Sequence, residues 1–259
     1  MRVQPGAIAR RLLHSGAPRQ TLWSFLDDGG SNGGAYQYSL RHSQPEPPVL
    51  ASIREAALVR DPVEAQKMIS PLQGAFMRHL VRSQRPQTVL ELGCYVGYSA
   101  LWLAHGLQSL PGLSPPKLWT CERDSGIANL AKDNIKAAGL ADTVHVLNAS
   151  AKHVLEEWDS QQKLDLVFVD ANKSACQLYY DLIMDRDLLS DHGQIIVDNV
   201  LFHGQVHPLI GDSGVSSAGP GSNIAHKMHR FNEHVAIDQR TDQVLLPMFD
   251  GLLLIQRVK

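Results

Sequence analysis

Short apolar segments that alternate with helical segments constrain the fold of this chain more than any other feature. In segments such as "LDLVFVD" and "GQIIVDN", the apolar residues are consecutive rather than alternate. Consecutive apolar residues indicate strands that are buried on both faces, as in parallel sheets covered by helices. The five predicted strands of this kind are 88–93, 117–122, 143–149, 164–170 and 193–199.

The segments around these strands have the spacing of apolar residues that is typical of helices. Gly139 is expected to end the helix that is predicted at 126–140. A helix is also predicted from about Pro71, with Leu72, Phe76 and Leu80 on one face. A short helix, a proline-rich turn and another helix are predicted within 35–58, and further helices at 98–107, 126–140, 151–158 and 174–189.

The C-terminal segment has a different pattern. Two strands, 241–248 and 251–258, are separated by "FDG", which indicates a hairpin. The predicted fold class is therefore α/β, a mostly parallel sheet with helices on both faces and an antiparallel pair of strands at the end of the chain.

Composition excludes several classes of protein. Of the 259 residues, 44% are apolar and 19% are charged, which is ordinary for a globular chain with a sizeable core. The net charge is −2, so no basic field indicates a nucleic-acid partner. No apolar run reaches the roughly 18 residues of a membrane span. Three cysteines (Cys94, Cys121 and Cys176) without CxxC spacing are typical of a reducing compartment.

The N-terminal segment has its own composition. Arg2, Arg10, Arg11 and Arg19 occur before the first acid, Asp27. This pattern has two interpretations, an extension of a cytoplasmic protein or a mitochondrial presequence, and we take the cytoplasmic one as the prediction. A flexible break, "DDGGSNGG", follows. We therefore predict an N-terminal extension over 1–34 and a single domain over 35–259; within it, a Gly/Ser-rich loop at 209–223 is expected to be mobile.

Ligands of open α/β sheets bind beyond the carboxyl ends of the strands, where polar residues are found in this chain. After the first strand, "ELGCYVG" has Gly93 for a tight turn and Gly97 for close approach of the next helix. Its G-x-x-x-G spacing differs from the G-x-G-x-x-G of dinucleotide enzymes. The Glu91 carboxylate suits a cofactor with a positive charge, such as a sulfonium; the alternative is a structural turn with an exposed glutamate.

The other strand ends also have acids. Glu122 ends the second strand, where a carboxylate can accept hydrogen bonds from a ribose diol. Asp170 and the pair Asp198–Asn199 end the fourth and fifth strands, which are expected to face one crevice. Two carboxylates and an amide suit a hard cation: Mg²⁺, or alternatively Ca²⁺ or Mn²⁺. The alternative is helix capping by Asp170 and a turn at Asp198–Asn199.

Several motifs together resemble the cation-dependent O-methyltransferases of the caffeoyl-coenzyme A and catechol O-methyltransferase type. They are "ELGCYVGYSAL", "FVDANK", "IIVDNVLFHGQV" and "LPMFDGLLL", and the resemblance extends from about Tyr36 to Val258. It implies a Rossmann-like class I methyltransferase fold with seven strands. It also implies S-adenosylmethionine as cofactor, and a homodimer, because relatives commonly form one.

The resemblance also implies roles for individual residues. Lys173 matches the general base, and Asp170 acts with it in catalysis. Asp170, Asp198 and Asn199 would hold the metal. Asn172, His203 and Asp250 would lie on the substrate side, where Asp250 could instead hold the C-terminal hairpin. The cofactor would contact Ile69, Glu91, Gly93, Cys94, Ser99, Glu122, Ser150, Ala151 and Asp170.

Two positions differ from the family pattern. Asn172 of "DANK" replaces an acid of the usual "DADK", and His203 stands where the plant enzymes have a polar substrate contact. These differences concern the identity of the methyl acceptor more than the type of reaction.

The predicted function is therefore methyl transfer from S-adenosylmethionine to a hydroxyl of a catechol-type small molecule, such as a phenylpropanoid or flavonoid, with a divalent cation. In this mechanism the cation binds both diol oxygens and lowers the pKa of one, and Lys173 removes the proton. Two alternatives remain: an inactive relic that still binds the cofactor, and a Rossmann oxidoreductase that uses NAD(P). The G-x-x-x-G spacing and Glu91 argue against the oxidoreductase.

Overall fold

The computed structural model describes residues 33–108, 117–209 and 222–258. The predicted extension and presequence thus lie almost wholly outside the described residues, as does most of the predicted mobile loop at 209–223. In the parts of the chain that are described, no helix is long and apolar enough to cross a membrane. All three cysteines are free and buried.

Seven strands form one sheet in the order β3-β2-β1-β4-β5-β7-β6. Neighbours from β3 to β5 are parallel, whereas β7 is antiparallel to both β5 and β6. The predicted fold class is confirmed, including the antiparallel C-terminal hairpin. The strands are β1 (Thr88–Leu92), β2 (Lys117–Cys121), β3 (Val144–Leu147), β4 (Leu164–Val169), β5 (Leu189–Asp198), β6 (Thr241–Leu246) and β7 (Leu252–Arg257).

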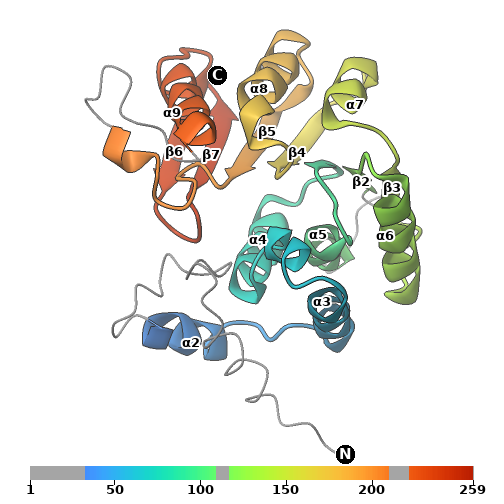
Figure 1. The fold of residues 1–259 in the computed structure, drawn as a ribbon. Coiled ribbons are helices and arrows are strands. Elements are labelled where there is room, and N and C mark those ends of the chain that lie inside the picture. The colour runs from blue at the N-terminus through green and yellow to red at the C-terminus, as the bar shows by residue number, and fades with distance from the viewer. Residues whose placement is uncertain (1–32, 109–116, 210–221, 259) are drawn as a thin grey trace, which may run out of the picture.

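Helices cover both faces of this sheet. In Figure 1, α7, α8 and α9 lie on one side of the strands, and α3, α4 and α5 lie on the other. The helices are α2 (Gly33–Arg41), α3 (Pro48–Arg60), α4 (Pro71–Gln84), α5 (Tyr98–Gln108), α6 (Ser125–Ala137), α7 (Ala151–Glu157), α8 (Cys176–Asp185) and α9 (Ser222–Ala236).

The alternation of side chains along the central strands explains the two layers. Successive residues of a strand point to opposite faces. In β1, Leu90 and Leu92 belong to the core beneath α7, α8 and α9, whereas Val89 belongs to the core beneath α3, α4 and α5. In β4, Val167 and Phe168 are divided in the same way. Both faces of these strands must therefore be apolar, as the sequence has them.

Helix α4 begins where it was predicted, because Pro71 fits the first turn of a helix and Ser70 caps it. The Ser70 hydroxyl oxygen accepts a hydrogen bond from the Gln73 amide at 3.1 Å. The helix packs closely on α5: a Cβ built on Gly74 would lie 2.2 Å from the indole nitrogen of Trp102. The predicted apolar face with Phe76 is only half-buried, because α4 turns its Gly74 side to α5.

The largest errors in predicted boundaries lie at the end of α8 and the start of β5. Helix α8 ends at Asp185 rather than at 189, because Asp187 has φ +54°, which a helix cannot accommodate. Strand β5 then begins at Leu189 rather than at Gly193. Between its two parts the register with β4 shifts, and Gly193 lies so close to β4 that a Cβ there would be 2.6 Å from the Leu164 carbonyl oxygen.

Helix α9 was not predicted at all. Its buried residues Ala225, Met228, Phe231 and Val235 have helical spacing, so a signal was present in the sequence. It follows the Gly/Ser-rich segment, and its many polar residues obscure the pattern. The helix completes the layer over β6 and β7 (Figure 1).

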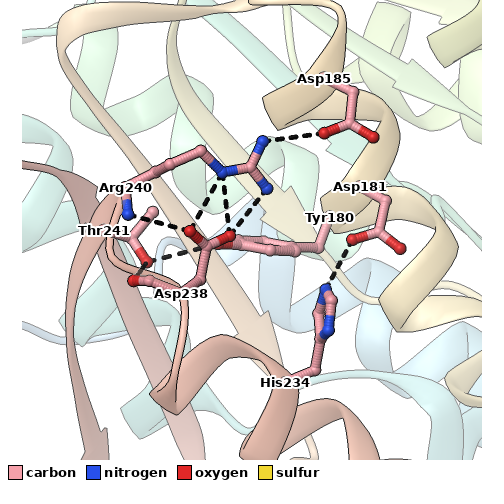
Figure 2. A network of polar contacts seen from close by, with 7 residues as sticks. All are labelled: Tyr180, Asp181, Asp185, His234, Asp238, Arg240 and Thr241. Atoms are coloured by element: carbon pink, nitrogen blue, oxygen red, sulfur yellow. Dashed lines mark hydrogen bonds and ion pairs between the residues drawn. The ribbon is translucent and has the colours of Figure 1, made fainter.

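A polar network fastens α8 to the segment between α9 and β6 (Figure 2). Asp238 accepts hydrogen bonds from the Arg240 guanidinium at 2.7 Å and from the Tyr180 hydroxyl at 2.7 Å. Arg240 also reaches Asp185 at 2.8 Å, and His234 contacts Asp181 at 2.8 Å. Hydrogen bonds from Arg240 hold the pKa of Asp238 below its ordinary value.

Removal of the Asp238 carboxylate should destabilise the protein in a pH-dependent way. A depressed pKa in the folded state adds stability that is complete above the unfolded pKa, about 4, and is lost as the pH falls through the folded value. We expect Asp238→Asn to lower the free energy of unfolding at pH 7 by about 1 kcal/mol. The difference from wild type should shrink below about pH 4. Urea denaturation at several pH values measures it.

The exposed Asp133 of α6 offers a matched control, since Asp133→Asn removes the same charge without a contact of this kind. It should leave the free energy of unfolding within about 0.5 kcal/mol of wild type at every pH. A pH-independent deficit in Asp238→Asn would contradict the assigned role of the ionised carboxylate.

Candidate active site

A large cavity opens beyond the carboxyl ends of the parallel strands. The chain runs from β1 outward through β2 to β3, then returns to β4 on the other side of β1, so β1 and β4 form the switch point of the sheet. The cavity has a volume of about 1080 Å³. Of the predicted site residues, all but Glu91 line it: Ile69, Gly93, Cys94, Ser99, Glu122, Ser150, Ala151, Asp170, Asn172, Lys173, Asp198, Asn199, His203 and Asp250.

The loop after β1 depends on its two glycines for different reasons. Gly93 has φ +100°, and a Cβ there would lie 2.4 Å from the Asp170 carbonyl oxygen. Gly97 has φ +85°, but a Cβ there would meet only ordinary contacts at 3.6 Å, with Ala131 and Ile135. The prediction that Gly97 permits close helix approach was therefore wrong: the left-handed backbone is what requires it. The close approach occurs at Gly93, between the ends of β1 and β4.

Glu91 is fully buried beneath this loop rather than exposed. The Thr120 hydroxyl donates to one of its carboxylate oxygens. Burial and, to a smaller extent, the charge of Asp170 raise the pKa of Glu91 to about 8, although hydrogen bonds from Ser99 and Thr120 oppose the shift. The alternative of an exposed structural glutamate is thereby excluded, and the carboxyl lies behind the cavity wall rather than on it.

Glu122 follows β2 and fixes the loop after β1. Its two carboxylate oxygens accept hydrogen bonds from the backbone amides of Tyr95, at 3.1 Å, and Asp124, at 3.0 Å. Tyr95 has φ +47°, a conformation that such a contact helps to maintain. The acid therefore joins two strand ends and leaves its remaining lone pairs at the cavity.

The next strand end supplies Ser150 and Ala151. Ser150 caps α7, since its hydroxyl oxygen accepts from the His153 amide at 3.2 Å. Ala151, the first residue of α7, is buried against the cavity. Ile69, on the opposite wall before α4, is also buried. Ile69 and Ala151 thus add buried apolar side chains to the cavity wall.

At the end of β4, Asp170 and Lys173 form an ion pair. Both side chains are largely buried, at 14% and 16% exposure. Asn172, and not Asp170, has the capping role: its side-chain oxygen accepts from the Ser174 amide at 3.1 Å and begins the 3₁₀ helix η3 (Lys173–Ala175). The helix-cap alternative for Asp170 is thereby excluded, and the residue that differs from the family pattern explains how η3 begins.

Asp198 lies at the end of β5, beside Asp170, because β4 and β5 are adjacent and parallel. It is 3% exposed and accepts from the Gln73 side-chain amide at 2.9 Å and from the Asn199 backbone amide at 2.8 Å. Burial and the charge of Asp170 together raise the pKa of Asp198 to about 7, against the opposing charge of Lys173. The site thus concentrates two carboxylates near one lysine.

Asn199 follows with a left-handed backbone, φ +61°. Its side-chain nitrogen donates to Asp250 at 3.1 Å, and the other Asp250 oxygen accepts from the His203 backbone amide at 2.6 Å. Burial raises the pKa of Asp250, whereas His203 opposes this shift. The His203 side chain is 50% exposed. The turn from Asn199 to Phe202 is present, with an amide-to-carbonyl hydrogen bond of 3.1 Å, so the turn interpretation of Asp198–Asn199 holds alongside the convergence of their side chains.

Over the described ranges, no group of three or more His, Cys, Asp or Glu side chains is placed to hold a metal ion. A cation at this strand edge would therefore depend on the amide oxygen of Asn199 as a third donor beside Asp170 and Asp198. Carboxylate and amide oxygens are the donors that Mg²⁺, Ca²⁺ and Mn²⁺ prefer. The donor set thus fits a hard cation with open positions for water or a ligand.

Several cavity residues escaped prediction from sequence. Gln73 reaches Asp198 from α4, 125 residues away in the chain. Tyr36, Phe202 and Phe249 add aromatic wall, and the Phe249 ring packs on Phe76 with centroids 6.2 Å apart. Only the packing of α2, α4 and the hairpin turn brings these residues to the strand ends. No local pattern marks them.

The sequence matches the O-methyltransferase family over residues 40–258, most of the chain. The O-methyltransferase ankF of Aspergillus thermomutatus is 29% identical over 230 residues, which are 85% of this chain and 91% of that protein. A catechol O-methyltransferase of Niastella koreensis is 29% identical over 194 residues, 72% of this chain and 80% of that protein.

A solved structure is similar in fold over nearly the whole chain. It is the Podospora anserina methyltransferase PaMTH1 bound to S-adenosylhomocysteine, with a TM-score of 0.79, 29% identity, and coverage of 90% of this chain and 97% of that one. The predicted family and enzyme class are thereby confirmed: the chain belongs to the O-methyltransferase family.

Proposed function

We propose that this chain transfers a methyl group from S-adenosylmethionine to one hydroxyl of a vicinal aromatic diol, and that it requires a divalent cation, Mg²⁺ before Ca²⁺ or Mn²⁺. The observation that carries the proposal is the convergence of Asp170, Lys173, Asp198 and Asn199 on one cavity, next to the glycine loop after β1. Family membership supports the reaction class; the acceptor and the cation are inferred from the residues.

The half of the cavity beyond the carboxyl ends of β1, β2 and β3 suits the cofactor. A relative of similar fold holds S-adenosylhomocysteine, the demethylated form of S-adenosylmethionine. Glu122 can accept the ribose hydroxyls with the lone pairs that its amide contacts leave free. Ala151 offers an apolar contact for adenine, with Ser150 beside it. Glu91 places a carboxyl group behind the loop; its raised pKa leaves it mostly neutral near pH 7, and the charge of a bound sulfonium would favour its ionised form.

The half of the cavity beyond the carboxyl ends of β4 and β5 suits the cation. Burial first, and then the charge of Asp170, raises the pKa of Asp198, and one lysine offsets only part of the negative charge of the two carboxylates. Asp170, Asp198 and Asn199 would hold the ion, and when bound it would supply Lewis-acid stabilisation of a phenolate. These three residues lie next to the cofactor half of the cavity. A cation bound to them would therefore hold the acceptor oxygen close to the methyl group of the cofactor.

Lys173 is the proposed proton acceptor. Burial lowers its pKa, but the charges of Asp170 and Asp198 outweigh this effect and raise it overall. A lysine with a raised pKa is protonated near neutrality and cannot act as a base. The proposed role therefore requires additional positive charge beside the two carboxylates. Within the cavity, Lys173 would hold or receive the phenolic proton at Nζ.

The acceptor side is partly aromatic, which suits a planar phenolic ring. Phe202 and Phe249 line it, and the half-exposed His203 stands at its edge. Asn172 uses its side chain to cap η3 and so is less available for a substrate contact. A phenylpropanoid or flavonoid diol fits these features. The homodimer, the single domain from residue 35 and the cytoplasmic location stay predictions.

The main competing proposal is a protein that still binds the cofactor but has lost catalysis. The presence of Asp170, Lys173, Asp198 and Asn199 in one cavity argues against it. The other alternative, a Rossmann oxidoreductase, is at odds with membership in the O-methyltransferase family.

Cation dependence tests the proposal directly. The full chain is incubated with methyl-labelled S-adenosylmethionine and a panel of catechols, caffeoyl esters and flavonoids. We expect methylated product with Mg²⁺. EDTA should lower the rate of methyl transfer at least about 100-fold, and excess Mg²⁺ or Mn²⁺ should restore it. Full activity in EDTA would refute the cation, and no product from any diol would favour the inactive relic.

Asp170→Ala should separate the two halves of the cavity. It removes a proposed cation ligand, so methyl transfer should fall to background while the Kd for S-adenosylhomocysteine changes less than about threefold. Asp133→Ala, on the exposed face of α6, is the control for loss of one acidic side chain. Near-normal methylation of a catechol by Asp170→Ala would show that the ligand assignment is wrong.

Gly93→Ala tests the cofactor half. The added Cβ would lie 2.4 Å from the Asp170 carbonyl oxygen at φ +100°, so the loop must shift. We expect the Kd for S-adenosylhomocysteine, measured by calorimetry, to rise at least about tenfold, equivalent to about 1.4 kcal/mol. Gly139→Ala is the matched control: its φ is +70°, yet nothing lies within 4 Å. It should lower stability and leave that Kd unchanged; equal effects of both variants on the Kd would contradict the account.

A further inference from the structure

The contact between Asn199 and Asp250 fixes which end of an amide faces the strand edge. The Asn199 side-chain nitrogen donates to an Asp250 carboxylate oxygen at 3.1 Å. An ionised carboxylate can only accept hydrogen bonds, so the amide must turn its NH₂ group toward Asp250. The amide oxygen, the atom of that group that can bind a cation, then points to the other side.

We propose that Asp250 is a positioning residue that selects the orientation of Asn199 in which oxygen, rather than nitrogen, is offered to the cation. This inference rests on the proposed function, because it assumes a cation at Asp170, Asp198 and Asn199. It gives Asp250 a role different from the substrate contact expected from the sequence. Partners of metal ligands commonly fix ligand orientation in this way.

The second oxygen of Asp250 supports the same role. It accepts from the His203 backbone amide at 2.6 Å. Its side chain is only 13% exposed, and both of its oxygens are occupied by groups of the loop after β5. Asp250 therefore contacts the loop that carries Asn199 at two points, one on the side chain and one on the backbone.

The backbone of the hairpin turn joins this loop as well. The Leu201 amide donates to the Asp250 carbonyl at 3.0 Å, and the Val200 amide donates to the Gly251 carbonyl at 3.2 Å. A Cβ at Gly251 would lie 2.6 Å from the Leu201 side chain, so the two segments are in close contact. Backbone contacts alone thus hold the hairpin turn against the loop after β5.

The loop needs such support because its backbone is strained. Asn199, Phe202 and His203 have φ of +61°, +40° and +54°. Such a conformation is unfavourable for residues other than glycine, so surrounding contacts must maintain it. Asp250 receives a hydrogen bond from two of these three residues. It therefore acts where the loop conformation is least favourable.

A double-mutant cycle on Mn²⁺ binding tests this role. The Kd for Mn²⁺ of the full chain with S-adenosylhomocysteine is measured by electron paramagnetic resonance for wild type, Asp250→Ala, Asn199→Asp and the double variant. We expect Asp250→Ala to raise the Kd about 10- to 100-fold. In the Asn199→Asp background, where either end of the side chain is oxygen, the same change should leave the Kd unchanged or lower it.

Controls separate orientation from general damage. Asp191→Ala removes a charge from the exposed far end of β5 and should not change the Mn²⁺ Kd. The Kd for S-adenosylhomocysteine should stay within about twofold in every variant. If Asp250→Ala does not fold, Asp250→Asn replaces it in the cycle, because it keeps the shape but can accept only one of the two hydrogen bonds.

The outcomes are distinct. An unchanged Mn²⁺ Kd in Asp250→Ala, or an equal rise in both backgrounds, would overturn the positioning role while leaving the cation site in place. Absence of Mn²⁺ binding in the wild-type chain would overturn the proposed cation site and this inference with it.

Discussion

The burial of two carboxylates at the ends of adjacent parallel strands is the constraint on which the rest of this site depends. β4 and β5 bring Asp170 and Asp198 to one edge, and the pKa of Asp198 rises to about 7 through burial and the charge of its neighbour. Such a pair is unfavourable unless positive charge or donated hydrogen bonds compensate it. Lys173 and Gln73 supply part of this compensation, and the proposed divalent cation would supply the rest.

Distant parts of the chain converge on this pair. Gln73 reaches Asp198 from the first turn of α4, whose position depends on the Ser70 cap and on the close packing of Gly74 against α5. From the opposite direction, Asp250 reaches Asn199 from the turn between β6 and β7. The antiparallel end of the sheet therefore does more than extend it: its turn accepts hydrogen bonds from Asn199 and His203, two left-handed residues of the loop after β5.

Local sequence was sufficient where a residue's role is set by its own strand or turn. Asp170 and Glu122 lie at the cavity, as expected from sequence, because polar residues at the ends of parallel strands must share one edge. Prediction failed where the fold decides: the contact of Gln73 with Asp198 spans 125 residues, and the start of β5 depends on a register shift against β4. Asn172 was expected on the substrate side and as the loss of an acid, whereas its side chain caps η3, a local role that its residue type and position could have indicated.

The central claim is that Asp170, Asp198 and Asn199 hold one divalent cation. An anomalous difference map from a crystal grown with Mn²⁺ and S-adenosylhomocysteine tests it most directly. The account predicts a single strong peak at the ends of β4 and β5, about 2.1 to 2.3 Å from a carboxylate oxygen of each aspartate and from the amide oxygen of Asn199. A peak elsewhere, or none at this edge while the cofactor half is occupied, would contradict it.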